Sequence, residues 1–142
     1  MPTIFSRIIS GELPGRFVWR DEHAVAFLSI QPMRPGHTLV VPRAEVDHWV
    51  DLDPALASHL FQVAQQVGLA QRTEWNPMRV GVLIVGEEVP HVHIHVVPIN
   101  HPGELSFANV DQSPAPAALD DAAERIRGRL RDMGRAEADA TA

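Results

Sequence analysis

The chain has 142 residues, 45% of them hydrophobic and 21% charged, and its formal net charge is -6. These values are typical of one globular domain and argue against a mostly disordered chain. The acidic balance argues against a surface for nucleic-acid polymers, which is usually basic. The chain contains no cysteine, which excludes disulfides and thiolate metal sites. We see no signal peptide or membrane-spanning segment, so we expect a cytoplasmic protein with no membrane partner.

The first third of the sequence predicts a short helix and three strands. Thr3–Ile9 is largely apolar and ends at Ser10-Gly11, which is typical of one or two helical turns. Phe17–Arg20 and Ala24–Ile30 are separated by a short polar segment, which suits a pair of strands in a hairpin. A proline-rich turn then leads into His37–Val41, where β-branched residues predict a third strand.

The middle of the sequence predicts one long helix and two more strands. The helix should begin at Asp53-Pro54, an acidic cap followed by proline, and end near Trp75. One face should be buried, because apolar residues recur at helical spacing at Leu56, Leu60, Val63 and Val67. Arg79–Val85 and His91–Val97 predict the two strands, and the short connections permit antiparallel pairing.

The last part of the sequence predicts a second long helix, at about residues 117–133, followed by a flexible tail at residues 135–142. Together the elements predict an α+β domain with an antiparallel sheet of about five strands. We expect residues 1–142 to form a single domain whose core spans about residues 3–110.

The segment His91–Val97 alternates histidine with aliphatic residues. Successive side chains of a strand point to opposite faces, so the aliphatic side chains should face the core while His91, His93 and His95 share the other face. Neighbouring histidine Cα atoms would lie about 6.6 Å apart, so two rings could contact one phosphate. Imidazole suits this task because its pKa of about 6.5 leaves a neutral nucleophile near pH 7, while other rings can be protonated donors.

Two other interpretations of the histidines stay open. A single histidine on an exposed strand face is usually only a solvated polar residue, although three in strict alternation have no packing role. Three imidazoles can also hold zinc and leave one open position. Because the chain has no cysteine, a carboxylate such as Glu88 would have to supply any fourth protein ligand. We therefore rank metal binding second and expect no metal in the site.

The run His91–Val97 resembles the signature of the histidine triad (HIT) family, in which histidines alternate with apolar residues. Other segments resemble the family in the same chain order: Ile4–Pro14, Ala26–Ile30 and Pro35–Pro42. The similarity covers roughly residues 3–98, and the whole pattern is more specific than any one part.

The resemblance implies an α+β half-barrel that forms a homodimer with one continuous sheet and acts on a nucleotide at its α-phosphate. It implies that His93 is the nucleophile and forms a nucleotidyl-histidine, which water then resolves. His95 and His37 would bind phosphate oxygens and manage protons. His91 would help to orient His93, partly through its backbone carbonyl. No cofactor is implied.

The expected substrate is a purine nucleotide, and the predicted substrate-binding residues are Phe5, Ile8, Ser29, Ile30, Glu88 and Val89. The chain departs from the family at three places. Thr3 and Ser6 stand where many members have a Cys-x-x-Cys pair that contributes to a structural zinc site, so that site should be absent. Ser29 stands where members commonly have aspartate. Glu87 and Glu88 stand where they have glutamine and a hydroxyl residue.

The leading hypothesis is an enzyme that acts on purine nucleoside phosphoramidates or adenylates. A dinucleoside polyphosphate hydrolase would use the same histidines with a longer leaving group. A non-catalytic nucleotide- or metal-binding protein would keep the histidines without turnover.

Overall fold

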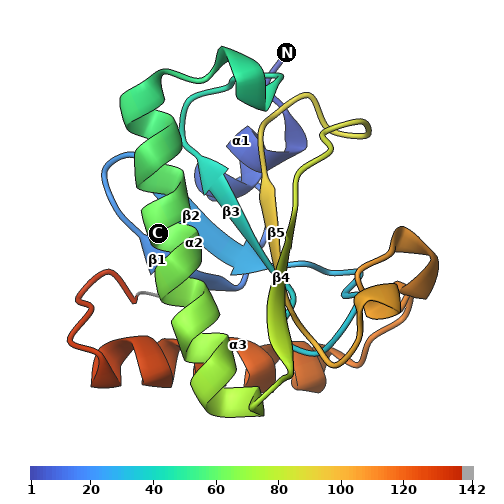
Figure 1. The fold of residues 1–142 in the computed structure, drawn as a ribbon. Helices are drawn as coiled ribbons and strands as arrows, with labels where there is room; N and C mark the ends of the chain where they lie inside the picture. The colour runs from blue at the N-terminus through green and yellow to red at the C-terminus, as the bar shows by residue number, and fades with distance from the viewer. Residues whose placement is uncertain (139–142) are drawn as a thin grey trace.

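The computed structural model describes residues 1–138 and is centred on one antiparallel sheet (Figure 1). Its five strands lie in the order β1-β2-β3-β5-β4. All neighbouring strands are antiparallel. Their bounds are Phe17–Arg20 for β1, Ala24–Leu28 for β2, Thr38–Pro42 for β3, Arg79–Leu83 for β4 and Ile94–Ile99 for β5. The predicted α+β fold is confirmed.

Three α-helices accompany the sheet: α1 at Ile4–Ile9, α2 at Pro54–Trp75 and α3 at Pro116–Asp132. The predicted cap of α2 is present, since the Asp53 side chain accepts from the Ala55 N–H. Asn76 ends this helix in a left-handed conformation, with φ at 46°. Short 3-10 helices lie at Trp49–Asp51, Pro102–Glu104 and Phe107–Asn109.

The two faces of the sheet have separate cores. Helices α2 and α3 pack on one face, where Leu60 and Ile126 meet Ile94; α2 crosses in front of the sheet in Figure 1. Helix α1 packs on the opposite face, where Phe5 joins a cluster with Phe27. The aliphatic residues that alternate with the histidines lie in the core on the α2 side of the sheet, as the alternation predicts: Val92, Ile94 and Val96. The histidines therefore belong to the α1 face.

The strand that carries the histidines begins later than predicted, at Ile94 instead of His91. The backbone before it bonds outside the sheet, since the His91 N–H donates to the Val89 carbonyl and the Val92 N–H donates to the Val46 carbonyl. These partners pull residues 91–93 away from the ladder. His91 and His93 therefore precede the strand, and only His95 lies within it.

The two edges of the sheet differ. At β1, Arg127 donates to the Phe17 carbonyl and the Arg20 N–H donates to the Glu137 carbonyl, each at 2.9 Å. These contacts cover the β1 edge with α3 and the segment after it. No strand of the described residues pairs with the outer side of β4. The flexible tail predicted from residue 135 stays a prediction for residues 139–142, which lie outside the described residues.

Among residues 1–138, none of the helices combines the length and the apolar character needed to cross a bilayer. The predicted cytoplasmic location stays a prediction.

Candidate functional site

A cavity of about 1110 Å³ opens on the α1 face of the sheet. Its walls come from α1, the end of β2, the loop before His91 and the 3-10 helix at Phe107–Asn109. Nine of the ten predicted site residues line it: Phe5, Ile8, Ser29, Ile30, His37, Glu88, Val89, His93 and His95. The tenth, His91, is fully buried behind the wall. The structure thus brings the predicted residues together, and their roles stay predictions.

His93 presents a ring nitrogen to this cavity. Its Nδ1 lies 2.8 Å from the backbone carbonyl of His91, and a carbonyl oxygen only accepts, so Nδ1 carries the proton. In the neutral ring, Nε2 therefore holds a lone pair. Burial lowers the pKa of His93, an effect that the bond to the His91 carbonyl partly offsets. The ring is held at its edge by Phe5, with 4.8 Å between ring centroids.

His91 is held from two sides. Its Nε2 lies 2.7 Å from the Pro42 carbonyl, so Nε2 donates. The neutral ring then accepts at Nδ1 from the Thr3 hydroxyl, at 2.6 Å. Thr3 is itself anchored, because its N–H donates to Glu45 at 2.8 Å and the Ser6 hydroxyl donates to the same carboxylate oxygen at 2.6 Å. The start of α1 thus holds the residue that orients His93.

His37 and His95 form a second chain of hydrogen bonds. The Met33 N–H donates to His37 Nδ1 at 3.0 Å, so that nitrogen carries no proton. His37 must then donate from Nε2 to His95 Nδ1, at 2.9 Å. A neutral His95 therefore carries its proton on Nε2. This atom is buried and has no hydrogen-bond partner among the described residues. The chain thus ends in a buried donor that lacks an acceptor.

Both rings of this chain are neutral near pH 7. Burial, followed by the neighbouring His95 and His93 rings, lowers the pKa of His37 to about 3. Burial and the His93 ring lower the pKa of His95 to about 4. The sequence allowed protonated donors beside the nucleophile. The structure corrects this, because desolvation disfavours the charged form of both rings.

The residues at the triad do not fit a metal. No group of three or more His, Cys, Asp or Glu side chains within residues 1–138 is placed to hold one. Both nitrogens of His91 bond to protein atoms, and the Nδ1 atoms of His93 and His95 do so as well. At the positions of the family's Cys-x-x-Cys pair, Thr3 and Ser6 offer hydroxyls that already bond within the chain. Zinc prefers thiolate, imidazole and carboxylate ligands, so we derive no step through a metal.

Sequence reasoning missed several residues of the site. Phe107 lies beside His95 with 5.3 Å between ring centroids, and about half of its surface is exposed. Its irregular loop has no periodicity that could have indicated this. Glu45 lies 42 residues from Thr3, and no motif connects them. Thr3 was singled out only as a missing zinc ligand.

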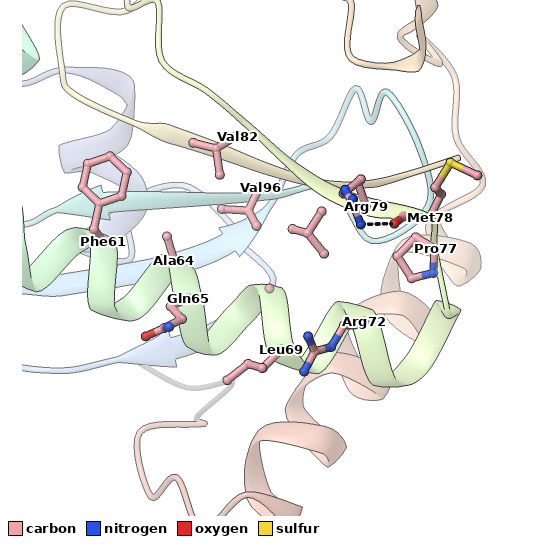
Figure 2. Close-up of a pocket in the computed structure, with 12 residues that line it drawn as sticks. Phe61, Ala64, Gln65, Leu69, Arg72, Pro77, Met78, Arg79, Val82 and Val96 are labelled. Carbon is pink, nitrogen blue, oxygen red and sulfur yellow. Dashed lines mark hydrogen bonds between the residues drawn. The ribbon is translucent and has the colours of Figure 1, made fainter. Parts of the chain in front are cut away.

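A second hollow lies on the far side of the molecule, between α2 and β4, and has a volume of about 450 Å³. Figure 2 shows Phe61, Val82 and Met78 along this groove, with Arg72 and Arg79 toward one end. No histidine or carboxylate lines it. The groove therefore lacks the groups for acid–base or nucleophilic chemistry, and the α1-face cavity is the candidate active site.

The comparisons with known proteins agree with the triad geometry. A family model for the HIT domain matches residues 10–101. The chain belongs to the HIT family. Protein hit of Bacillus subtilis (strain 168) is 34% identical to this HIT protein over 100 residues, which cover 67% of this chain and 69% of that protein. Membership supports nucleotide binding, and hydrolase or transferase activity in general.

Solved structures of similar proteins have the same architecture. A zinc-bound histidine triad family protein from Mycobacterium smegmatis matches with a TM-score of 0.79 and 27% identity, covering 94% of this HIT protein and 96% of that chain. A hypothetical histidine triad nucleotide-binding protein from Sulfolobus tokodaii strain7 matches with a TM-score of 0.81 and 24% identity, covering 97% and 98%. At that identity the second match supports the fold alone.

Proposed function

We propose that this HIT protein cleaves a purine nucleotide at its α-phosphate through a nucleotidyl-histidine formed on His93. One observation supports the proposal: a ring lone pair and a buried, unpartnered ring N–H belong to two neighbouring rings that line one cavity. The lone pair is on His93 and the N–H on His95, with 4.9 Å between ring centroids. A nucleophile beside a preorganised donor is the arrangement that transfer of a phosphorus-centred group requires.

The reaction follows from the tautomers. His93 Nε2 attacks the α-phosphorus and the bond to the leaving amine breaks. The amine nitrogen keeps the electron pair of that bond and takes up a proton from solvent. The His95 Nε2–H donates to a phosphate oxygen and stabilises the charge that develops there. The ring attached to phosphorus becomes cationic, and the His91 carbonyl stabilises it by accepting from Nδ1–H. Water then attacks phosphorus and releases one proton to solvent, while the breaking P–N bond returns its electron pair to His93.

The proposed nucleoside pocket is apolar at the base and sparsely polar at the sugar. Phe5, Ile8 and Ile30 supply apolar walls that suit a purine ring. Ser29 Oγ accepts from the Gln31 N–H at 3.2 Å, so its hydroxyl proton is available for one ribose hydroxyl. A carboxylate could accept from two hydroxyls. Discrimination between ribose and deoxyribose should therefore be modest.

The leaving group should be an amine instead of a polyphosphate. Glu88 lies on the exposed loop that borders the cavity and is close enough to raise the pKa of His93 electrostatically, against the larger effect of burial. An ionised carboxylate there repels a polyphosphate chain and attracts a cationic amine. Phosphoramidates should therefore be preferred over dinucleoside polyphosphates.

A substrate panel tests the proposed function. The protein would be incubated with adenosine and guanosine phosphoramidates, acyl-adenylates and dinucleoside polyphosphates, and the products and the intact protein would be followed by mass spectrometry. We expect release of the nucleoside monophosphate and a transient mass increase of one nucleotidyl group. Preferential cleavage of polyphosphates would favour the alternative hydrolase. Tight binding without any product would show a nucleotide-binding protein without turnover.

We also propose a homodimer that joins the β4 edges of two chains. The outer side of β4 has no partner among the described strands. Beside it the groove of Figure 2 exposes Phe61, Met78 and Val82 by 49%, 69% and 45%. An unpaired edge next to apolar side chains is suited to a symmetric contact. Light scattering at micromolar concentration should give twice the 15.7 kDa chain mass, and Val82→Lys should lower it. A monomer mass for the wild type would refute the dimer.

A further inference from the structure

Helix α2 buries one polar side chain within the described chain, that of Gln71. Its Nε2 donates to two carbonyls, those of Gly36 and Val96, each at 2.9 Å. Gly36 directly precedes His37, and Val96 directly follows His95. A single amide group thus bonds to the residue before His37 and to the residue after His95.

Packing alone does not explain this glutamine. Leu60, Val63 and Val67 precede it on the buried face of α2, and an apolar residue would continue that face. The Oε1 atom of Gln71 is buried and lacks a hydrogen-bond partner among the described residues. A buried acceptor without a partner carries a desolvation penalty. The two bonds from its Nε2 are therefore what distinguishes glutamine from an apolar residue at this position.

The turn before His37 is clamped onto α2. Gly36 has a φ of +89°, and a Cβ atom there would lie 2.7 Å from the Trp75 ring, so a side chain is excluded. The Gly36 carbonyl accepts from Gln71 and also from the Thr38 hydroxyl, at 2.8 Å. These contacts fix the distance between the turn and β5. The 2.9 Å bond from His37 to His95 depends on that distance.

We propose that Gln71 is a positioning residue, which holds the His37 and His95 backbones at the separation that keeps the His37-to-His95 hydrogen bond closed. Through that bond it determines which nitrogen of His95 presents a proton to the cavity. Gln71 does not line the cavity, so it acts through the two histidines. The kinetic consequence rests on the proposed function, whereas the consequence for the hydrogen bond does not.

The matched variants are Gln71→Met and Gln62→Met. Methionine has a similar length and removes both donors. Gln62 is an exposed residue of the same helix and has no hydrogen bond to another side chain within residues 1–138. We expect Gln71→Met to change Tm little, since it removes the unpartnered acceptor together with the two hydrogen bonds to carbonyls. We expect kcat to fall roughly ten- to a hundred-fold, as misplaced catalytic groups do, with KM changed by less than about two-fold. Gln62→Met should change neither. A fall in Tm at unchanged kcat would show a purely structural role.

Nitrogen NMR tests the proposal without any substrate. In the wild type, ¹⁵N spectra should show a coupling through the hydrogen bond between His37 Nε2 and His95 Nδ1, and couplings from the Gln71 amide to the Gly36 and Val96 carbonyls. The histidine coupling should vanish in Gln71→Met, or in Gln71→Leu if the methionine variant does not fold. Its persistence in either variant, or absence of the glutamine couplings in the wild type, overturns the proposal. If the wild type cleaves no nucleotide, the function fails and this test still decides the role of Gln71.

Discussion

His93 and His95 are separated by one residue and face the same cavity, yet they offer it opposite groups. The Nδ1 of His93 donates to a backbone carbonyl, so its Nε2 presents a lone pair. The Nδ1 of His95 accepts from His37, so its Nε2 presents a proton. The residue type and the neutral charge are the same in both. The partner of the Nδ1 atom therefore decides whether a triad histidine can act as a nucleophile or as a donor.

The two rings also depend on different parts of the fold. The chain of bonds behind His93 runs through His91 to Thr3 at the start of α1 and ends at Glu45. The chain behind His95 runs through His37 to the Met33 backbone. A substitution in one of these two series of hydrogen bonds should therefore affect one ring and leave the other unchanged.

The largest effect is expected from His93→Ala. It removes the lone pair that is proposed to attack phosphorus, so kcat should fall on the order of 10⁴-fold or more, and no nucleotidyl adduct should form. Nucleotide binding, measured by calorimetry, should persist because the cavity walls remain. The control is His23→Ala, at an exposed position outside the cavity. A variant with near wild-type turnover would place the nucleophile elsewhere.

His95→Ala should have the next largest effect, because it removes the unpartnered donor and leaves the nucleophile in place. We expect kcat to fall by about 10²- to 10³-fold, as for other preorganised donors to a developing anion. A nucleotidyl adduct on His93 should still be detectable by mass spectrometry. His101→Ala, at an exposed position, is the control. Complete loss of the adduct would mean that the two histidines act as one unit.

The pH profile should separate the two rings. Protonation consumes the lone pair of His93, and burial lowers the pKa of that ring below 6.5. Activity should therefore be full above that pKa and fall about tenfold per pH unit below it. The pKa of His95 is lowered to about 4, so protonation of that ring should affect activity only around that pH. The check is kcat/KM against pH with a neutral leaving group; an acid limb centred at or above pH 6.5 would contradict the assignment.

Thr3→Val should weaken only the series of hydrogen bonds behind His93. It removes the hydroxyl that bonds to His91 and the cap that accepts from the Ser6 N–H, so kcat should fall about tenfold through misplacement of the nucleophile. Stability should fall by about 1 kcal/mol, as on loss of a helix cap. Thr3→Ser should keep kcat and stability near the wild-type values. Thr73→Val, at an exposed position of α2, should change neither quantity. Equal losses in Thr3→Ser and Thr3→Val would show that the hydroxyl is not the group that matters.

The smallest effect is expected from Glu88→Gln, which alters the loop in front of both rings. The ratio of kcat/KM for an amine phosphoramidate to that for a dinucleoside tetraphosphate should fall about two- to five-fold, the size of a screened surface charge effect. Glu87→Gln is the matched control, because Glu87 also lines the cavity. An unchanged ratio in Glu88→Gln would mean that this carboxylate points into solvent.

Local patterns predicted the elements of the fold, whereas long-range contacts decided the details of the site. The alternation of His91–Val97 indicated which side chains share a face, but it placed the strand start three residues early, because the bond from Val92 to Val46 is tertiary. The tautomer of His95 depends on His37 and Met33, and the position of His91 depends on Thr3; no local pattern connects Met33 or Thr3 to the triad. The sequence could have indicated Gln71, since this residue interrupts the apolar face of a helix that the sequence predicts.

The covered edge of β1 limits how many chains a contact through β4 could join. With α3 and Glu137 occupying β1, two subunits that pair through β4 leave no second sheet edge among their described residues. A chain truncated before Pro116 would expose both edges, and each added subunit would offer a fresh one to the next. Growth would then be open-ended and would lead to fibres. If the proposed dimer forms, the C-terminal helix would therefore limit the assembly to two subunits by covering β1.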